Sequence, residues 1–588
     1  IPARVSSHSS FKISRMGQET LCLTDPDGRV LDKMILPEQR TNVSYGRTQG
    51  MSGFFYYDTP TPFQMNGSGF SGYAENPAFS EEPGMYNSTT YVSISIPEGC
   101  QVYYTVDGST PTEASTAYNG ERLEMNFTTV LRAKAFPADP TLHASDTITG
   151  TWFIGAYHTL PVVSVTTDPV NLWDYNTGML AEGPIVKEAA GKLPFKNSTY
   201  RAVKDSGARF PCYVEMYDTD GTTLISQGAQ FSLMGDYSLD MPQKSMKFRA
   251  KSLYGSKTFA ASLFEDREYT EYKSFVLRNS GNDSMWTRLQ DGFQSRLLDA
   301  YGATVIHQAW KPVAVYLNGV YWGHMNLRER VDKYFVAQHE GLTLDEADNI
   351  DILQASGAVK YGSNKAFRAM IKKIKAGDPA KNPEDLQYIL DNVDVDNLFE
   401  YMALEMFVGN SDIGNTRFYR VREEGSKWRW IWYDVDYGLF NSAFDSPSSY
   451  TRSGGMGQQK IDNTIFTKLL SVPEYKDKYL RKYGEIFQYF TTERMLEILE
   501  PLVELITPEM ELHWARWGEE NDKMVISEVP TTVDGAYRYW EKRVERLRNV
   551  LRKRPNKLWS LTKDAFQLTE AEMVEYFGPQ PELPPDAV

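Results

Sequence analysis

Two short polar stretches hold residue types that could bind phosphate and a divalent cation. The first runs from Asn410 to Asn415 and contains Asp412, and the second closes an aromatic segment and contains Asp434 and Asp436. Paired carboxylates supply the oxygen ligands that Mg²⁺ prefers, and an Asp in a loop can accept the proton of a hydroxyl group. Together they favour phosphoryl transfer, which depends mainly on positioning and charge neutralisation.

The residue pattern also predicts the elements around these acids. Residues 428–436 alternate like a strand, on which side chains at i and i+2 face the same side. Residues 397–408 are typical of a helix capped by Asp396 and ended by Gly409, so the first acidic stretch falls in the loop before the strand. We therefore expect three aromatic rings, a surface suited to a purine base, to share one face with both carboxylates: Trp428, Trp430, Trp432, Asp434 and Asp436.

The expected order is a helix, a loop with Asp then Asn, and a strand that ends in acids. The catalytic loop and metal loop of kinases have the same order of residue types. In kinases one Asp receives the acceptor proton, while an Asn and a second Asp hold metal. The spacing from Asp412 to Asn415 is shorter than in ordinary protein kinases, and the chain has no H-R-D and no D-F-G. The pattern indicates a kinase-like site outside the ordinary protein-kinase motifs.

Length and composition set the outer limits. A chain of 588 residues exceeds what one core usually serves, so we expect at least two domains, and the pattern favours three. The net charge of −15 argues against a nucleic-acid partner, because phosphate neutralisation requires a basic surface. Cys22, Cys100 and Cys212 form neither a disulfide framework nor a metal cluster. No apolar run approaches the roughly 18 residues of a membrane span. Because the chain opens Ile-Pro-Ala-Arg, we expect a piece of a longer precursor that lacks its signal peptide.

The first 156 residues are short strand patterns broken by turns. Residues 44–47 (Ser-Tyr-Gly-Arg) and 59–66 resemble the C-terminal half of the lamin-tail β-sandwich. Residues 103–112, Tyr-Tyr-Thr-Val-Asp-Gly-Ser-Thr-Pro-Thr, resemble the chitobiase C-terminal, fibronectin-III-associated module of secreted bacterial proteins. Such modules mostly space or position their neighbours, and glycan binding is the alternative role.

A basic strand is expected at residues 245–251. Lys244 shares a face with Met246 and Phe248, whereas Lys247 lies on the other face. Either ammonium group could meet a nucleotide phosphate as a point charge. The alternative is a solvated edge strand, where lysine discourages pairing between molecules.

The next strand, at 274–278, leads to two polar candidates. It ends before Asn279, and Asp283 then precedes a helix expected over 284–301. Asp283 is therefore either the cap of that helix or a ligand.

The clearest local structure is a hairpin in which Asn318-Gly319 joins strands 313–317 and 320–325. Glu329 lies just beyond it. This carboxylate could pair with a phosphate-binding lysine, as in ordinary kinases, or it could form a surface ion pair that stabilises little.

Taken in order, these motifs resemble the CotH kinase family, named after spore coat protein H. The resemblance covers residues 158 to about 555 and rests on these segments: Pro-Gln-Lys-Ser-Met-Lys, the strand to Asn279 with Asp283, Leu-Asn-Gly-Val-Tyr-Trp-Gly with Arg-Glu-Arg-Val-Asp, the 410–415 loop, and Trp-Arg-Trp-Ile-Trp-Tyr-Asp-Val-Asp-Tyr-Gly. It implies an atypical kinase that transfers the γ-phosphoryl group of ATP to serine with Mg²⁺ or Mn²⁺.

The resemblance also implies a role for each candidate. Asp412 is the expected catalytic base and Asn415 a supporting metal or phosphate contact. Either Asp434 or Asp436 binds metal, and Asp436 is favoured because it directly precedes Tyr-Gly. The remaining assignments concern the nucleotide: Lys244 or Lys247 contacts phosphate, Glu329 helps to position it, Trp430 stacks on adenine, and Asn279 and Asp283 belong to the same site.

We therefore predict a multidomain chain, with N-terminal β-sandwich pieces followed by an α+β atypical kinase-like domain that has a helical C-terminal portion. The expected divisions are a partial lamin-tail-like domain, a chitobiase-like sandwich, a kinase-like domain and a tail, at 1–67, 68–156, 157–555 and 556–588.

The predicted function is ATP- and metal-dependent phosphorylation of serine in an extracellular, spore-coat or other bacterial surface protein, which places this chain outside the cell. The β modules could add an association with the cell surface or with glycans. A kinase-like structural or adhesive protein without turnover is the alternative. A carbohydrate-active enzyme ranks last, because Asp434 and Asp436 are too close in sequence to flank a glycosidic bond.

Overall fold

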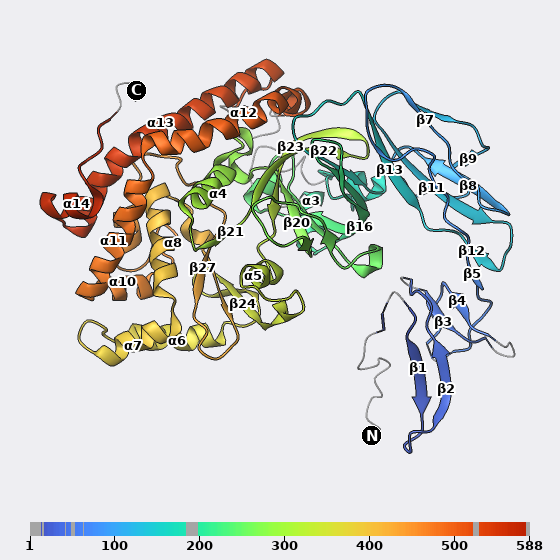
Figure 1. The fold of residues 1–588 in the computed structure, drawn as a ribbon, viewed down its shortest axis with the longest axis horizontal. Coiled ribbons are helices and arrows are strands. Elements are labelled where there is room, and N and C mark those ends of the chain that lie inside the picture. The colour runs from blue at the N-terminus through green and yellow to red at the C-terminus, as the bar shows by residue number, and fades with distance from the viewer. Residues whose placement is uncertain are drawn as a thin grey trace.

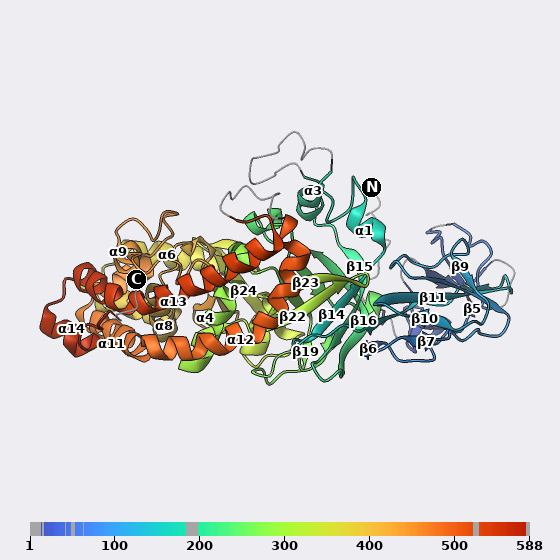
Figure 2. The ribbon, with the colours of Figure 1, turned by 90° about the horizontal axis from the view of Figure 1, so that it is seen from above.

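The computed structural model describes residues 13–14, 17–40, 43–48, 53–62, 64–183, 198–520 and 529–583. The molecule is elongated, with strand-rich N-terminal modules at one end, a β-barrel in the middle and a bundle of helices at the other end (Figures 1 and 2). This arrangement confirms the predicted fold class, β modules followed by an α+β region with a helical C-terminal portion.

The N-terminal strands form small sheets around separate cores. Two hairpins pair β1 with β2 and β3 with β4 (Thr20–Thr24, Val30–Ile35, Ser44–Gly46 and Phe55–Tyr57). A five-stranded sheet follows, in the order β6-β13-β11-β8-β9 (Gly84–Tyr86, Ile148–Ile154, Thr129–Pro137, Cys100–Thr105 and Thr116–Tyr118). Trp152 and Val102 of this sheet pack with Val92 of the small sheet β7-β10 (Thr90–Val92 and Leu123–Met125), and none of the three is exposed. We call residues 72–154 the β-module.

A closed barrel occupies the centre of the molecule. Its order is β14-β15-β16-β17-β20-β23-β22 (Val162–Thr166, Phe210–Tyr217, Thr223–Leu233, Met246–Arg249, Ser274–Arg278, Val320–Glu329 and Trp310–Leu317). The predicted hairpin is confirmed as β22 and β23, and Asn318 and Gly319 have the positive φ angles, 48° and 77°, of a tight turn. The basic strand β17 pairs on both sides, so the alternative of an edge strand is wrong.

A second sheet lies between the barrel and the helices, in the order β21-β27-β26-β24-β25 (Ile306–His307, Arg429–Trp432, Arg417–Val421, Ile350–Gln354 and Ala358–Tyr361). The predicted helix before the acidic loop is α8, Val395–Val408, which ends at Gly409 as expected but is capped by Asp394 instead of Asp396. Strand β27 ends at Trp432, before both acids. The expected alternation through Asp434 and Asp436 is therefore wrong.

The helix expected over 284–301 is shorter. A 3₁₀ turn covers Gly281–Met285, and α4 spans Gln290–Tyr301 with Gly302 at its end. The short helices α1 (Pro169–Trp173) and α3 (Thr199–Asp205) pack on the barrel core through Leu172 and Tyr200. Most of the helices after α4 pack around α8: α5 Lys333–His339, α6 Lys365–Ala376, α7 Pro383–Asn392, α9 Ser446–Thr451, α10 Thr464–Leu470, α11 Pro473–Tyr489, α12 Thr492–Trp517, α13 Val533–Phe566 and α14 Glu570–Phe577.

The C-terminal region is helical where a tail was expected. Helix α13 continues through Pro555 to Phe566, and α14 follows (Figure 1). A proline inside a helix frees the carbonyl four residues earlier, and Thr492 donates its hydroxyl to that group, the Leu551 carbonyl, at 3.3 Å. This bond from α12 compensates for the missing backbone donor, so the sequence rule that proline ends a helix fails here.

The β-module is joined to the barrel through a buried junction. Phe153 of β13 packs on Tyr217 of β15 and Tyr316 of β22, with ring centroids 5.7 and 4.9 Å apart. Beside them the backbone N–H of Thr151 donates to Oε1 of Glu215 at 3.1 Å, and its hydroxyl donates to Oε2 at 2.5 Å. Apolar packing and satisfied polar groups thus hold the two parts together.

Candidate active site

Arg278 on the barrel binds the carboxylates of the two acids that follow β27. Nη2 of Arg278, the last residue of β20, donates to Oδ1 of Asp434 at 2.5 Å and to Oδ2 of Asp436 at 3.2 Å. Asp434 adopts a positive φ of 61°, so the chain turns after the strand and still brings both carboxylates to one place. The second oxygens, Oδ2 of Asp434 and Oδ1 of Asp436, accept no hydrogen bond from the described part of the chain.

The loop after α8 brings a third acid to the same place. Asp412 starts the 3₁₀ turn Ile413–Asn415, and its carboxylate accepts from the Asn415 amide and the Gln459 amide, both at 3.0 Å. Burial, together with the negative charge of Asp434, raises the pKa of Asp412. The half-buried Asp412 therefore lies near enough to Asp434 to feel its charge, and its role as a base stays a prediction.

Helix α13 fixes the end of α8 that carries this loop. The guanidinium of Arg554, which has no exposed surface, donates to the carbonyls of Met406 and Phe407 at 2.8 and 2.9 Å. It also donates to the Phe444 carbonyl and to the Ser446 hydroxyl, both at 2.7 Å, at the start of α9. One buried side chain thus joins the C-terminal helix to the position of the acidic loop.

Asp436 is the most crowded of the three acids. Burial, then repulsion from Asp434, raises its pKa to about 7, although Arg278 and the backbone N–H of Asn282, at 2.8 Å, oppose the rise. Gly281, with φ of 62°, lies directly against the pair, because a Cβ there would come within 2.3 Å of Asp436 Oδ2. The site has more negative charge than one arginine balances, which suits an additional cation.

Lys247 lies on the outer face of the barrel beside this cluster. It pairs with Val276, so Arg278 is its diagonal neighbour, at about 7–8 Å on neighbouring strands. Its ammonium group makes no hydrogen bond or ion pair within the described ranges. Burial, with the positive charges of Arg330, Arg209 and Lys204, lowers the pKa of Lys247 to about 8. A half-buried cation surrounded by like charges is suited to an anionic ligand.

Lys244, the other predicted phosphate ligand, points the opposite way. Its Nζ donates to the carbonyls of Leu239 and Met241 at 2.9 and 3.1 Å and lies 3.8 Å from the ring centroid of Tyr200. The residue is 6% exposed. Lys244 therefore serves the packing at one end of the barrel, and we retain only Lys247 as a phosphate contact.

Within the described ranges, Glu329 pairs with no lysine. It lies opposite Phe275, which pairs with the core residue Phe248, so it shares the barrel face opposite to that of Lys247. Its carboxylate accepts from Nε of Arg267 at 3.0 Å and from the Ala309 N–H at 2.8 Å. The expected pairing is wrong, because the alternation of the strand separates the two side chains.

Asn279 and Asp283 are structural. The Asn279 amide donates to the Gln243 carbonyl at 2.6 Å and accepts from the hydroxyl of Ser245 at 2.8 Å. Asp283 accepts from the N–H groups of Thr287 and Gln290 at 2.8 and 2.9 Å, so its carboxylate supports the start of α4, although it lies within the 3₁₀ turn and Leu289 is the N-cap of that helix. Exposed fractions of 0% and 2% leave neither side chain a surface for a cofactor.

The expected aromatic platform is a core. Trp430 is 7% exposed, packs on Phe418 with ring centroids 5.8 Å apart, and donates its backbone N–H to Asn397 of α8. Trp428 and Trp432 are buried beside it. Trp430 therefore does not present its ring to a base, because the indoles fill the space between β27 and α8.

Sequence reasoning missed three contributors to the site: Arg278, Gly281 and Asn282. Arg278 meets Asp434 and Asp436 across more than 150 residues of chain, a contact that no local spacing predicts. The available signal was the turn-forming run Asn-Ser-Gly-Asn at 279–282, directly after an apolar strand.

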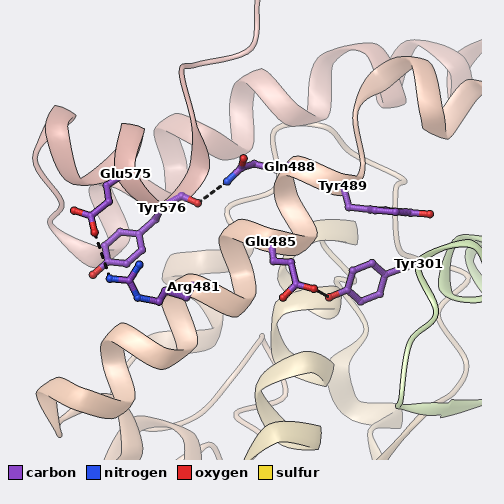
Figure 3. A pocket seen from close by; sticks show the side chains of 7 residues that line it. All are labelled: Tyr301, Arg481, Glu485, Gln488, Tyr489, Glu575 and Tyr576. Carbon is purple, nitrogen blue, oxygen red and sulfur yellow. Dashed lines mark hydrogen bonds and ion pairs between the residues drawn. The ribbon is translucent and has the colours of Figure 1, made fainter.

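A hollow on the helical side of the molecule is lined by charged groups that pair with one another. It has a volume of about 660 Å³ and lies between α11, α14 and Tyr301 (Figure 3). Arg481 pairs with Glu575 at 3.3 Å, and Tyr301 donates to Glu485 at 2.7 Å. The charged groups that line this hollow are therefore already paired with one another.

Two families of known proteins match this chain. The family described as CotH kinase protein matches residues 231–558, and the chitobiase/beta-hexosaminidase C-terminal domain matches residues 81–149. The first of these matches identifies the chain as a kinase-like protein. Because the first match covers more than half of its length, the chain belongs to the CotH kinase family. No curated protein matches the chain. The lamin-tail resemblance stays a prediction. None of the helices in the described ranges combines the length and the apolar character needed to cross a bilayer.

Proposed function

We propose that this chain transfers the γ-phosphoryl group of ATP to serine residues of an extracellular, spore-coat or other surface protein, using Mg²⁺ or Mn²⁺. The observation that carries the proposal is that Arg278 holds Asp434 and Asp436 together, while Asp412 in the preceding loop is close enough to Asp434 for its charge to raise the pKa of Asp412. Membership of the CotH kinase family supports the kinase-like part of this assignment.

The donor set fits a divalent cation that is shared with phosphate. Asp434 and Asp436 each keep one oxygen without a hydrogen bond from the described residues, and carboxylate oxygens suit Mg²⁺ and Mn²⁺. No three His, Cys, Asp or Glu side chains in the described part form a complete metal site. Mg²⁺ is often bound through one or two carboxylates and the phosphates of a substrate. When bound, the cation would neutralise charge on the phosphates.

Asp412 is the proposed base that accepts the serine proton. The Asn415 and Gln459 amides hold its carboxylate by one oxygen each, which fixes its orientation. Its raised pKa makes it a stronger proton acceptor than an ordinary Asp, and its partial exposure leaves it accessible to a hydroxyl group. In this proposal Asn415 positions Asp412 through its amide nitrogen.

Lys247 is the proposed phosphate contact, and Arg330 adds to the positive charge around it. Burial, and then repulsion from Arg330, lowers the pKa of Lys247, and a polyphosphate beside the two cations would relieve that repulsion. Arg278 is the diagonal neighbour of Lys247 and also contacts Asp434 and Asp436. We propose that it keeps Asp434 and Asp436 in place.

The test is transfer of label from ATP in the presence of Mn²⁺ to a serine-containing acceptor peptide. Asp412→Asn should lower the rate by about 10²–10⁴-fold, the usual contribution of a general base, and Asp436→Asn should abolish metal-dependent transfer. Asp396→Asn is the matched control, because Asp396 lies on the exposed first turn of α8, with a side chain 76% exposed. Equal rates in all variants would refute the site.

A kinase-like protein without turnover is the second candidate. Two observations favour it: Arg278 already engages both proposed metal ligands, and Glu329 has no lysine partner. Thermal unfolding separates the candidates, since a ligand that binds the folded state in excess raises the melting temperature. ATP with Mn²⁺ should raise it for wild type. Absence of both a shift and label transfer would favour the structural role.

A further inference from the structure

A hollow of about 650 Å³ runs along α13, and its other side is formed by residues 440–442, which follow Asp436 closely in sequence. Its lining joins the segment after Asp436 to one face of the helix: Phe440, Tyr539, Lys542, Arg546, Asn549 and Lys553. We call it the α13 groove. The ring of Phe440 lies 5.7 Å from that of Tyr437, the residue after Asp436, so the groove adjoins the proposed site of transfer.

The α13 groove is cationic in a molecule of net charge −15. Lys542, Arg546 and Lys553 recur at spacings of four and seven, which places them on one helix face. None of the three forms an ion pair or hydrogen bond within the described ranges. Glu545, an acid of the lining, is engaged by Arg548 at 3.2 Å and by Arg552 at 2.9 Å, so it does not neutralise them.

Aromatic rings pack against two arginines that line the groove, Arg543 and Arg546. The guanidinium of Arg543 lies 4.5 Å from the ring centroid of Trp286 and 5.6 Å from that of Phe440. Arg546 lies 5.1 Å from the same Phe440 ring. A ring face orients a guanidinium without cancelling its charge, whereas a carboxylate would cancel it. The groove is therefore preorganised for anions.

We propose that the α13 groove binds an acidic segment of the acceptor protein that flanks the serine to be phosphorylated. This inference rests on the proposed function. The rise of an α-helix separates Lys542 from Lys553 by about 16 Å, which an extended segment of about five residues spans. A run of Asp or Glu residues at that length can meet cations along the whole groove. The substrate class is accordingly a serine with neighbouring carboxylates.

Fluorescence anisotropy with a labelled peptide, serine flanked by five glutamates, measures docking independently of catalysis. Lys542→Glu and Lys553→Glu should each weaken binding about tenfold, because each removes an attraction and adds a repulsion. Lys557→Glu is the matched control: it lies on the same helix, is exposed and does not line the groove. Binding should also weaken between 50 and 300 mM salt. Melting temperatures within about 2 °C of wild type would show that the variants fold.

Two further arms separate docking from its alternatives. A peptide with five glutamines should bind at least about tenfold more weakly, and ATP without divalent metal should not displace the glutamate peptide. Displacement by ATP would assign the groove to polyphosphate and overturn the proposal. Equal affinity of Lys542→Glu, Lys553→Glu and Lys557→Glu would overturn it as well.

Phosphorylation of the two peptides distinguishes this inference from the proposed function. If the chain is a kinase that reads acidic flanks, kcat/KM is higher for the glutamate peptide, and Lys542→Glu removes that preference. Transfer at equal kcat/KM to both peptides refutes the inference and leaves the kinase assignment intact. Loss of binding in the groove variants without transfer to either peptide refutes the kinase assignment and supports docking.

Discussion

Gly281→Ala should disable the acidic cluster while leaving the fold in place. At this position the added Cβ would lie 2.3 Å from Oδ2 of Asp436 and 2.6 Å from Nη2 of Arg278. Ordinary contact begins near 3.4 Å, so the carboxylate must retreat by about 1 Å. A misplacement of about 1 Å at a reacting centre costs up to about 100-fold in rate. We expect label transfer from ATP to fall by that factor.

The control isolates the clash from the backbone strain. Gly302 also has a positive φ, 73°, but a Cβ there meets nothing within 4 Å. Both alanine variants bear the left-handed strain, about 1–2 kcal/mol, and should lose similar thermal stability. Only Gly281→Ala should lose activity. If the two variants transfer phosphate equally, the position of Asp436 does not govern the reaction, and the proposed geometry is refuted.

Three further predictions follow from buried or crowded charges. Lys247→Met should raise KM for ATP. In wild type, KM should rise as the pH passes about 8, the pKa at which Lys247 loses its charge. Lys244→Met, the control, should lower the melting temperature and leave KM unchanged. Burial raises the folded-state pKa of Glu405 to about 8, so its contribution to the free energy of unfolding is complete below about pH 4.5 and is lost as the pH rises to about 8. The loss is at most about 1.4 kcal/mol per pH unit. Glu405→Gln should flatten that slope in denaturant titrations. Arg554→Met should cost at least about 3 kcal/mol by leaving several carbonyls unpaired, whereas Arg552→Met, nearer the surface, should cost less than about 1 kcal/mol in the same titration.

Local patterns predicted the fold wherever neighbouring residues determine the outcome. The Asn318-Gly319 hairpin and the end of α8 at Gly409 both depend on residues that favour positive φ, and both are confirmed. The extent of α13 was missed, because Thr492 of α12, not a neighbour in sequence, compensates for Pro555.

The candidate site shows the same division. Strand alternation predicted opposite faces for Lys244 and Lys247, but Lys244 lies before β17 begins, and only the closed barrel decides which face of the strand is inside. For Trp430, the two-residue alternation of the strand indicates on which side of the sheet the ring lies, but not what packs against that side. A large apolar ring favours the core. Arg278 could not be predicted, since its partners come from a distant part of the chain.

The junction between the β-module and the barrel limits how this protein can be shortened. A chain beginning at residue 157 would expose the rings of Tyr217 and Tyr316 that Phe153 covers, and it would leave Glu215 without both donors from Thr151. Such a truncated protein should aggregate at concentrations where the longer chain stays monodisperse in light scattering. Enzymologists seeking a minimal catalytic fragment should therefore retain the β-module.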